Sequence, residues 1–374
     1  MQRVWSLFVK IRTLYFRFER LISSVSLVGG FVFDALTLRR VDLFWDNVWV
    51  AGHFCIIAVC IVAINFLENR KIVRKKSDAT FTDQNTWVHF WLVTILQFFF
   101  GGLLSTFLVF YFRSGTLSVT WPFLLLLGVA FFANESLKKH YTRLVFQISL
   151  FFLSLFSFAI FIVPIIVHQI GPVIFVLSGL VSIVILWLFL VLLRLIARET
   201  FQQSKKMLLI SVVSIFAITN ALYFANIIPP LPLSLQDGGV YHSLVHVNGG
   251  YLVTTENQSW LNFLSPYQVF HEVPGQPIYA LTAVFSPTAL NTTIIHEWQQ
   301  YDTASHQWVT KSRVHLTIIG GRAGGYNTYS MLGTITPGEW RVNVDTSNGQ
   351  VIGRLLFRVI GATTTPTLIT EVKN

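Results

Sequence analysis

The sequence predicts two domains of different fold class: an all-α membrane bundle of about seven helices, then an all-β sandwich of immunoglobulin or fibronectin type. Long apolar stretches fill the chain before Pro229, and a polar, turn-rich segment with alternating apolar residues follows Pro230. The 374 residues are 53% hydrophobic and only 12% charged, with a mean hydropathy of +0.61. Ordinary soluble domains carry about 25% charged residues, so burial in lipid explains this composition better than a large protein core does.

Seven apolar segments have the length of membrane-spanning helices. They are residues 21–37, 43–67, 87–112, 117–133, 144–168, 172–193 and 207–228. The first is short and contains Asp34, which leaves open whether it crosses the bilayer completely. We therefore expect a transmembrane domain at 21–228, a stiff proline-containing linker at 229–237 and a soluble domain at 238–374.

Basic residues gather at alternate ends of these segments. One side collects Arg3, Lys10, Arg12, Arg17, Arg20, Arg70, Lys71, Arg74, Lys75, Lys76, Lys138, Lys139, Arg143, Arg194, Arg198, Lys205 and Lys206. The short loops of the other side hold only Arg39, Arg40 and Arg113. By the positive-inside rule the N-terminus is cytoplasmic, and an odd number of spans then places the soluble domain outside the membrane.

Residues 1–20 are basic and amphipathic, with Val4, Leu7 and Ile11 on one helical face and Arg3 and Lys10 beside it. We expect a helix that lies on the inner leaflet of the membrane, and no cleavable signal peptide. A frayed N-terminal tail is the alternative.

Short alternating segments separated by Gly, Pro, Asn and Ser predict the strands of the outer domain. They are Val240–Val247, Tyr251–Thr255, Ile278–Phe285, Thr293–Tyr301, Val314–Ile319, Tyr326–Met331, Glu339–Asp345 and Val351–Ile360. A two-residue turn at Asn348-Gly349 predicts the register of the last two strands. It sets apolar residues opposite each other on one face and polar residues on the other, in the pairs Val344/Gly353, Val342/Leu355, Trp340/Phe357, Glu339/Arg358 and Asn343/Arg354. Trp298 is expected in the same core.

A glycine-rich loop at residues 320–325 is the first candidate ligand site. It follows a strand, but no helix and no Lys-Ser/Thr pair come after it, which excludes a nucleotide-binding loop. The guanidinium of Arg322, with Tyr326 and Tyr329, is expected to bind a carboxylate, phosphate or sugar. The alternative is that the glycines turn a corner of the sheet and Arg322 is solvated or paired with an acid.

A second candidate site combines ionisable residues at the outer ends of the first and third spans. Asp34, Arg40, Asp42 and Arg113 are expected to form a paired cluster beneath the soluble domain that holds an anionic headgroup, because ionisable groups at membrane depth are costly. The alternative is that these side chains reach the interface and fix the helix ends.

Several classes of function are excluded or unsupported by the sequence. The soluble domain is near neutral in charge and has no basic stripe, so we expect no nucleic-acid partner. Cys55 and Cys60 are wrongly spaced for a zinc site, and His242 and His246 on one strand lie too far apart to share an ion. No catalytic or cofactor-binding motif is found, so no metal and no cofactor are expected.

The outer segment resembles the DUF2914 family, bacterial multi-pass membrane proteins with a C-terminal domain of unknown function. The resemblance is carried by His296-Glu297-Trp298, Gly320-Gly321-Arg322, Gly325-Tyr326, Ser330, Gly338-Glu339-Trp340-Arg341-Val342, Gly349-Gln350-Val351-Ile352-Gly353-Arg354 and Phe357, and in the membrane half by residues 33–40, 111–114 and 134–135. It implies a bacterial envelope protein and no particular activity.

Two functional hypotheses follow. The first is an inner-membrane protein that presents a periplasmic β-sandwich for recognition of an envelope glycan, lipid headgroup or membrane protein partner. The alternative is an enzyme or carrier that acts on a lipid-linked substrate at the outer face of the helical bundle, through Asp34 and its neighbours. A sensor that signals to the cytoplasm is disfavoured because the inner loops are short.

Overall fold

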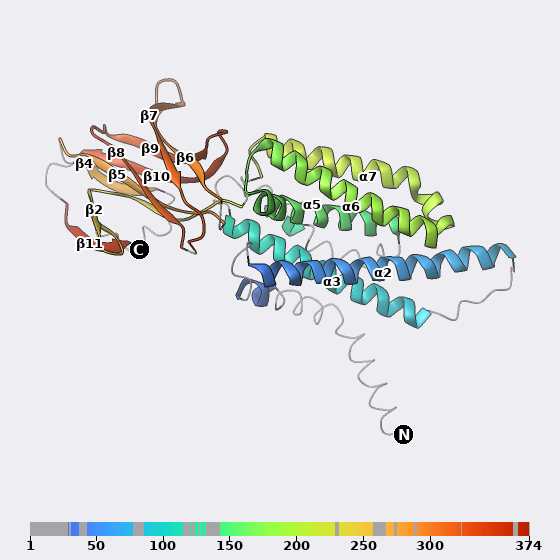
Figure 1. The fold of residues 1–374 in the computed structure, drawn as a ribbon. Helices are drawn as coiled ribbons and strands as arrows, with labels where there is room; N and C mark the ends of the chain where they lie inside the picture. Colours follow the sequence, from blue (N-terminus) through green and yellow to red (C-terminus); the bar gives the residue numbers. More distant parts are fainter. Residues whose placement is uncertain are drawn as a thin grey trace, which may run out of the picture. The chain divides into compact units, whose positions relative to one another are not determined.

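The computed structural model describes residues 29, 31–36, 43–77, 86–114, 121, 124–125, 127–129, 131, 143–228, 232–256, 267–272, 275–287, 290–322, 324–361 and 366–373. Helices occupy the N-terminal part of the chain and strands the C-terminal part (Figure 1). The chain divides into two compact units. The first contains most of the helical residues, and the second contains residues 111–123, 160–177 and 220–374.

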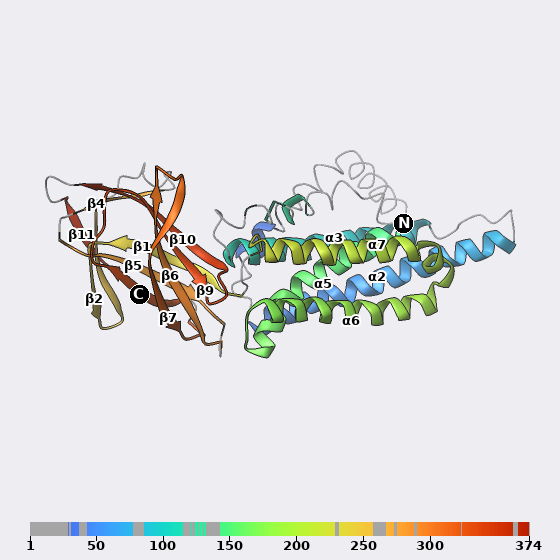
Figure 2. The same ribbon diagram turned by 90° about the horizontal axis from the view of Figure 1, so that it is seen from above.

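Five helices among the described residues are long and apolar enough to cross a membrane. They are α2 (Phe44–Ser77), α3 (Thr86–Ser114), α5 (Leu144–Val167), α6 (Pro172–Ile196) and α7 (Arg198–Phe224), and they run alongside one another (Figures 1 and 2). They correspond to the predicted spans 43–67, 87–112, 144–168, 172–193 and 207–228. The predicted spans 21–37 and 117–133 lie only partly within the described residues, and the predicted helix 1–20 lies outside them.

The helix α7 begins earlier than the apolar pattern predicts, at Arg198 instead of residue 207. Its first turn is capped by a side chain of α2, because Asn69 Oδ1 accepts hydrogen bonds from the backbone N–H groups of Glu199 at 2.9 Å and Thr200 at 3.4 Å. Such capping satisfies N–H groups that a helix leaves free at its start. A cap supplied from a distant segment gives no signal in the local sequence, so the apolar span predicted at 207–228 did not include the polar start of this helix.

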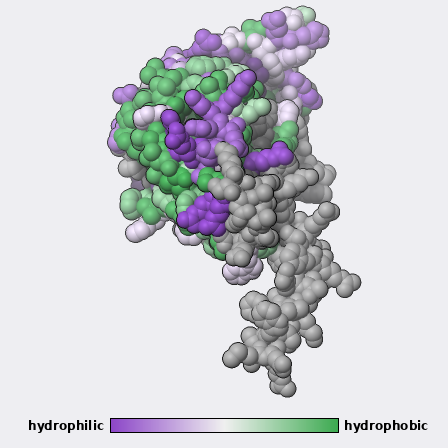
Figure 3. All heavy atoms as spheres, turned by 90° about the vertical axis from the view of Figure 1, so that its right-hand side faces the viewer, coloured by the Kyte–Doolittle hydropathy of each residue, from purple (hydrophilic) through white to green (hydrophobic). Residues whose placement is uncertain are grey.

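The helices of the first unit pack through a polar contact and through aromatic rings. Asn65 Nδ2 of α2 donates to Gln147 Oε1 of α5 at 2.6 Å, and both side chains are fully buried. Many outward side chains are apolar, among them Val59, Leu195 and Leu209, which are 67%, 78% and 66% exposed. Seen from the ends of the helices, apolar residues cover the flank and hydrophilic residues gather at the end (Figure 3). An apolar flank of this extent suits lipid as the surrounding solvent.

The second unit contains three sheets within the described ranges, with strand orders β1–β5–β8, β4–β10–β9–β6–β7 and β11–β3–β2. The strands are β1 (Ser234–Tyr241), β2 (Ser243–Val247), β3 (Gly250–Glu256), β4 (Gln268–Glu272), β5 (Ile278–Phe285), β6 (Thr292–Asp302), β7 (Gln307–Ile318), β8 (Tyr326–Leu332), β9 (Gly338–Thr346), β10 (Val351–Gly361) and β11 (Leu368–Lys373). Neighbouring strands are antiparallel, except that β4 and β10 are parallel.

The main core lies between the three-stranded sheet β1–β5–β8 and the five-stranded sheet. Trp298, Trp340 and Phe357 of the five-stranded sheet pack with Val240 and Ile278 of the other, and each is at most 2% exposed. The opposite face of the sheet β1–β5–β8 is covered by the sheet β11–β3–β2, through a cluster of Tyr241, Leu281 and Val253. The sheet β1–β5–β8 is therefore buried on both faces, which explains the nearly continuous burial along its central strand β5.

The predicted residue pairs of β9 and β10 are confirmed, but the predicted two-residue turn is wrong: the N–H of Thr346 donates to the carbonyl of Gln350, which leaves residues 347–349 in the turn, and the register shifts between Val351 and Gly353. Val344 pairs with Gly353, Val342 with Leu355, Trp340 with Phe357, Asn343 with Arg354 and Glu339 with Arg358. Gly349 in the turn has φ +78°, a conformation that suits glycine. Gly353 is required for close packing, because a Cβ there would lie 2.4 Å from the side chain of Leu235.

Some strand predictions are wrong. The predicted strand Val240–Val247 is two strands in different sheets, β1 and β2, separated at His242. The chain leaves the first sheet there because the N–H of His242 donates to the carbonyl of Thr254 in β3. The strands β4 and β11 were not predicted, since both are short edge strands whose polar residues lack an apolar alternation. β1 also begins inside the segment assigned to the linker, of which residues 229–231 lie outside the described residues.

Within the second unit, the end of α7 is joined to the β9–β10 turn. Tyr223 Oη donates to Gln350 Oε1 at 2.9 Å in a buried hydrogen bond, and the ring of Tyr223 stacks on Phe175 at 3.7 Å. Ile170 packs against the core cluster that contains Val344 and Ile352. The residues at the helix ends are therefore part of the packing of the β strands.

Replacing Tyr223 with Phe is expected to destabilise the second unit by about 1–2 kcal/mol, because the buried Gln350 loses its donor. Hydrogen exchange of the full-length protein should show faster exchange of the β9–β10 amides. Tyr301→Phe is the matched control, since the hydroxyl of Tyr301 bonds to His306 at an exposed site. Equal exchange in wild type and Tyr223→Phe would contradict the prediction.

Candidate functional site

The predicted ligand residues of the glycine-rich loop are only partly brought together: Arg322 and Tyr329 are exposed, whereas Tyr326 is partly buried against the core cluster that contains Val284. The guanidinium of Arg322 lies 6.0 Å from the ring centre of Tyr326, and the ring of Tyr329 meets Tyr251 of β3 edge-on at 5.8 Å. Tyr251 also contacts His246 of β2 at 5.2 Å. We call these five side chains the tyrosine cluster.

The tyrosine cluster combines exposed rings with one cation. Tyr329 is 45% exposed, and Arg322 is exposed as well. Burial raises the pKa of Tyr251, with smaller contributions from Tyr329 and Tyr326, and Arg322 acts in the opposite direction. The four groups are therefore close enough to influence one another electrostatically. Tyr251 and His246 were missed by the sequence reasoning, because they come from a hairpin far away in the chain.

The glycines of the loop serve packing. A Cβ on Gly320 would lie 1.9 Å from the carbonyl oxygen of Pro287, and Gly325 has φ +90° with the backbone of Ala283 against it. The N–H of Gly321 donates to the carbonyl of Ser286 at 2.9 Å, and that of Gly325 to the carbonyl of Arg322 at 3.2 Å. These two N–H groups are engaged within the protein, so neither of them is open to a ligand.

A buried hydrogen-bond network crosses the main core. The indole of Trp298 donates to Ser330 Oγ at 2.9 Å, His296 Nδ1 lies 2.9 Å from the same oxygen, and His296 Nε2 lies 2.8 Å from Thr282 Oγ1. Because an indole can only donate, Ser330 Oγ accepts the bond from Trp298, and the tautomer of the His296 ring sets the donor and acceptor roles in its bonds to Ser330 and Thr282. Burial lowers the pKa of His296 to about 4, so this residue is neutral at pH 7. With His296 fully buried and Ser330 only 3% exposed, the pair stabilises the core and offers no accessible nucleophile.

Glu256 of β3 forms a second network, with His242 and His271. His242 Nε2 lies 2.9 Å from Glu256 Oε1, and both the backbone N–H and Nδ1 of His271 lie 2.6 Å from the carboxylate. Burial alone would raise the pKa of Glu256, but the hydrogen bonds from His242 and His271 outweigh it and lower the pKa to about 2. This carboxylate ties β3 to β4 and to the break between β1 and β2.

The predicted outer-face cluster of the membrane domain is only partly described. Asp34 faces His53 of α2 and Ser105 of α3. Arg40 and Asp42 lie outside the described residues, and for Arg113 only the backbone in the last turn of α3 is described. The sequence reasoning missed His53, which is 8% exposed and has Nδ1 2.9 Å from the carbonyl of Trp49. The sequence signal that could have identified His53 is the presence of a histidine within an apolar helix.

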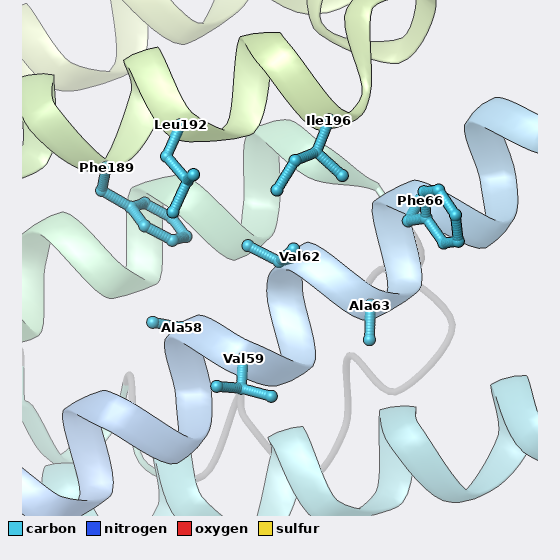
Figure 4. Close-up of a pocket in the computed structure, with 8 residues that line it drawn as sticks. All are labelled: Ala58, Val59, Val62, Ala63, Phe66, Phe189, Leu192 and Ile196. Carbon is cyan, nitrogen blue, oxygen red and sulfur yellow. The ribbon is translucent and has the colours of Figure 1, made fainter.

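A groove of about 480 Å³ lies between α2 and α6 in the first unit (Figure 4). Its walls are formed by Ala58, Val59, Val62, Ala63, Phe66, Phe189, Leu192 and Ile196. With only apolar side chains, it offers no group for acid–base or nucleophilic chemistry. In the part of the chain that the structure describes, no cluster of His, Cys, Asp and Glu could hold a metal ion, and Cys55 and Cys60 are not in a disulfide.

The Glu256 network predicts a loss of stability in acid. A carboxyl whose pKa is lower in the folded state stabilises the protein above its unfolded pKa, near 4.5, and this contribution disappears as the pH falls toward 2. Thermal unfolding from pH 7 to pH 3 should show Glu256→Gln less stable than wild type by about 1–3 kcal/mol at pH 7, with the difference shrinking below pH 4.5. Glu339→Gln, which removes the exposed pair with Arg358, is the control and should cost less than about 1 kcal/mol. A constant difference at all pH values would contradict this assignment.

Comparisons with known proteins give one informative match. No curated protein matches the sequence. Among solved structures, an alkylpurine DNA glycosylase AlkC of Pseudomonas fluorescens, bound to DNA containing an abasic site analog, is similar at 11% identity, covering 82% of this chain and 96% of that one, with a TM-score of 0.20. This likeness is too low to carry an argument about fold. Residues 291–359, from the start of β6 to near the end of β10, match the model of the family described as "Protein of unknown function (DUF2914)", which confirms the resemblance for this region.

Proposed function

We propose that the protein is a bacterial inner-membrane protein that presents a β-sandwich on the periplasmic side of the membrane to recognise an envelope glycan. The helical domain, with about seven spans and a cytoplasmic N-terminus, anchors the sandwich. Five long apolar helices among the described residues support the anchor.

The distribution of charge supports the orientation. Asn69 near the end of α2 bonds to the first turn of α7, so Arg70 and Arg74 lie at the same end of the first unit as Arg198. A concentration of positive charge at one end is typical of the cytoplasmic side. Since α7 begins at this end and leads into β1, the strands follow on the opposite side of the membrane.

The tyrosine cluster is the observation that carries the recognition function. The exposed ring of Tyr329 offers a flat apolar face with a polar edge, and the exposed Arg322, near the partly buried Tyr326, offers donors in a planar fork. Sugars combine apolar ring faces with hydroxyl or carboxylate groups, which these side chains match. The rings are held on β8, which pairs with β5, and on β3, which pairs with β2 and β11, so little ordering is needed on binding.

Glycan binding is tested with the full-length protein in lipid nanodiscs and soluble peptidoglycan fragments as the probe, by isothermal titration calorimetry. Tyr329→Ala is expected to weaken binding about tenfold, because one stacked ring contributes roughly 1.4 kcal/mol. Met331→Ala is the matched control, since Met331 is 52% exposed on the same strand and has no ring. Absence of binding to wild type, or equal losses in the two variants, would contradict the glycan proposal.

An enzyme or carrier for a lipid-linked substrate is the second candidate. It is favoured by the position of Asp34 beside His53 and Ser105, because polar groups within apolar helices mark functional sites.

Asp34→Asn and Arg113→Gln test this alternative in a deletion strain complemented with each variant. If the helical domain acts on a substrate, both variants fail to complement the deletion although they fold and accumulate normally, while Asp34→Glu complements it in part. Full complementation by Asp34→Asn would rule this candidate out.

A further inference from the structure

The five-stranded sheet has a second face, opposite the main core, that is polar and yet buried. It carries Glu297 and Gln299 of β6, Arg313 of β7, Arg341, Asn343 and Asp345 of β9, and Arg354 of β10, and we call it the arginine face. Glu297, Gln299, Asn343 and Asp345 are all at most 9% exposed. Polar side chains on a solvated sheet face are normally accessible to water. Solubility therefore does not explain why these polar residues are buried.

Two arginines of this face are held in place through one nitrogen each. Arg341 Nε donates to Gln299 Oε1 at 2.6 Å, and Arg354 Nε donates to Asn343 Oδ1 at 2.7 Å. Asn343 Nδ2 in turn lies 3.3 Å from Gln299 Oε1, which links the two arrangements. The guanidinium of Arg341 also lies 4.3 Å from the ring centre of Trp308. Both guanidiniums are therefore oriented before any ligand arrives.

The outer nitrogens of these two arginines have no bonded partner among the residues that the structure describes. In contrast, Arg313 pairs with Glu297 at 2.6 Å and Arg358 pairs with Glu339 at 2.7 Å. Arg354 lies opposite Asn343, so Arg341 is its diagonal neighbour across the strands. Burial lowers the pKa of Arg341 to about 10, and the charge of Arg354 acts in the same direction. The two neighbouring cations repel each other, Glu297 and Asp345 offset part of this repulsion, and a bound anion would relieve more of it.

Asp345 supplies a second, independent sign of a ligand. Its side chain is more than nine-tenths buried, and Oδ1 has no hydrogen-bond partner within the described ranges. The charged groups that face it are Glu297, Arg313, Arg341 and Arg354, and His315 of β7 lies on the same face of the sheet. Burial, followed by the charge of Glu297, raises the pKa of Asp345 to about 7. A buried carboxyl that is ready to hold or release a proton near neutral pH can bond to a ligand oxygen in either state.

We propose that the arginine face binds a phosphate group, with the outer nitrogens of Arg341 and Arg354 on its oxygens and one proton shared between the phosphate and Asp345. Guanidinium groups match the oxygens of phosphate in geometry and charge. The site is separate from the tyrosine cluster, so it does not depend on the glycan proposal.

The shared proton distinguishes phosphate from sulfate. Near neutral pH, inorganic phosphate brings an exchangeable proton, which can bond to ionised Asp345. Sulfate brings none, so it must bind to protonated Asp345. Phosphate affinity should therefore change little between pH 6 and pH 8, whereas sulfate affinity should fall steeply above the Asp345 pKa of about 7.

The experiment uses the full-length protein in phosphatidylcholine nanodiscs and inorganic phosphate as the probe, followed by equilibrium dialysis and by the shift in unfolding temperature. Arg341→Gln and Arg354→Gln are each expected to weaken binding at least tenfold, because each removes a charged donor. Arg358→Gln is the matched control on the same strand and face, since Arg358 already has a partner, and it should change binding less than twofold. Arg341→Lys and Arg354→Lys keep the charge and serve if the Gln variants do not fold.

A second arm replaces part of the lipid with phosphatidate, because Asp345 adjoins the turn whose Gln350 bonds to Tyr223 of α7. Competition between phosphatidate and inorganic phosphate would assign the site to a lipid headgroup, and its absence to a soluble phosphate. Asp345→Asn should make sulfate affinity independent of pH. Lack of saturable phosphate binding by wild type up to about 10 mM would overturn the proposal, as would equal losses in Arg354→Gln and Arg358→Gln.

Discussion

The register of β9 against β10 determines which side chains lie on each face of the five-stranded sheet. In this register Trp340, Val342, Val344 and Phe357 point into the main core, while Arg341, Asn343 and Arg354 form the arginine face. A slip by one residue would bring every charged side chain into the core, which the large cost of burying an unpaired charge forbids. The same register places Gln350 at the turn, where it accepts the hydrogen bond of Tyr223. Core packing, the connection to α7 and the proposed phosphate site therefore share one cause.

The residues that carry the DUF2914 resemblance are divided between these two faces. His296, Trp298, Ser330, Trp340 and Phe357 form the core and its hydrogen-bond network. Glu297, Arg341 and Arg354 lie on the arginine face. Tyr251 and His246 of the tyrosine cluster lie outside the matching region, residues 291–359. The matching region thus consists of a buried frame and one polar face, and the tyrosine cluster needs a hairpin that comes earlier in the chain.

Local patterns predicted the parts of the fold that depend on local chemistry. Apolar length identified the five long helices, and the alternation of apolar and polar side chains identified the β9–β10 pairs, although the turn between them has three residues instead of the predicted two. The pattern failed where a distant group decides the outcome. Asn69 extends α7 beyond its apolar part, Thr254 ends β1 at His242, and β4 exists because the edge of β10 accepts a parallel neighbour. For the candidate site, Arg322, Tyr326 and Tyr329 were identifiable from their loop. The position of Tyr251, the Glu256 network and the environment of Asp345, whose Oδ1 has no hydrogen-bond partner among the described residues, depend on tertiary contacts, which no local spacing encodes.

The β9–β10 register is tested most directly by cross-strand disulfides in a background with Cys55→Ala and Cys60→Ala. Glu339 and Arg358 are direct partners, and residues opposite each other across antiparallel strands lie within the range that a disulfide can bridge. After oxidation, mass spectrometry of the full-length protein should find the disulfide in Glu339→Cys/Arg358→Cys and little in Glu339→Cys/Val359→Cys. Efficient bridging of the second pair without the first would contradict the register, and with it the assignment of the core and the arginine face.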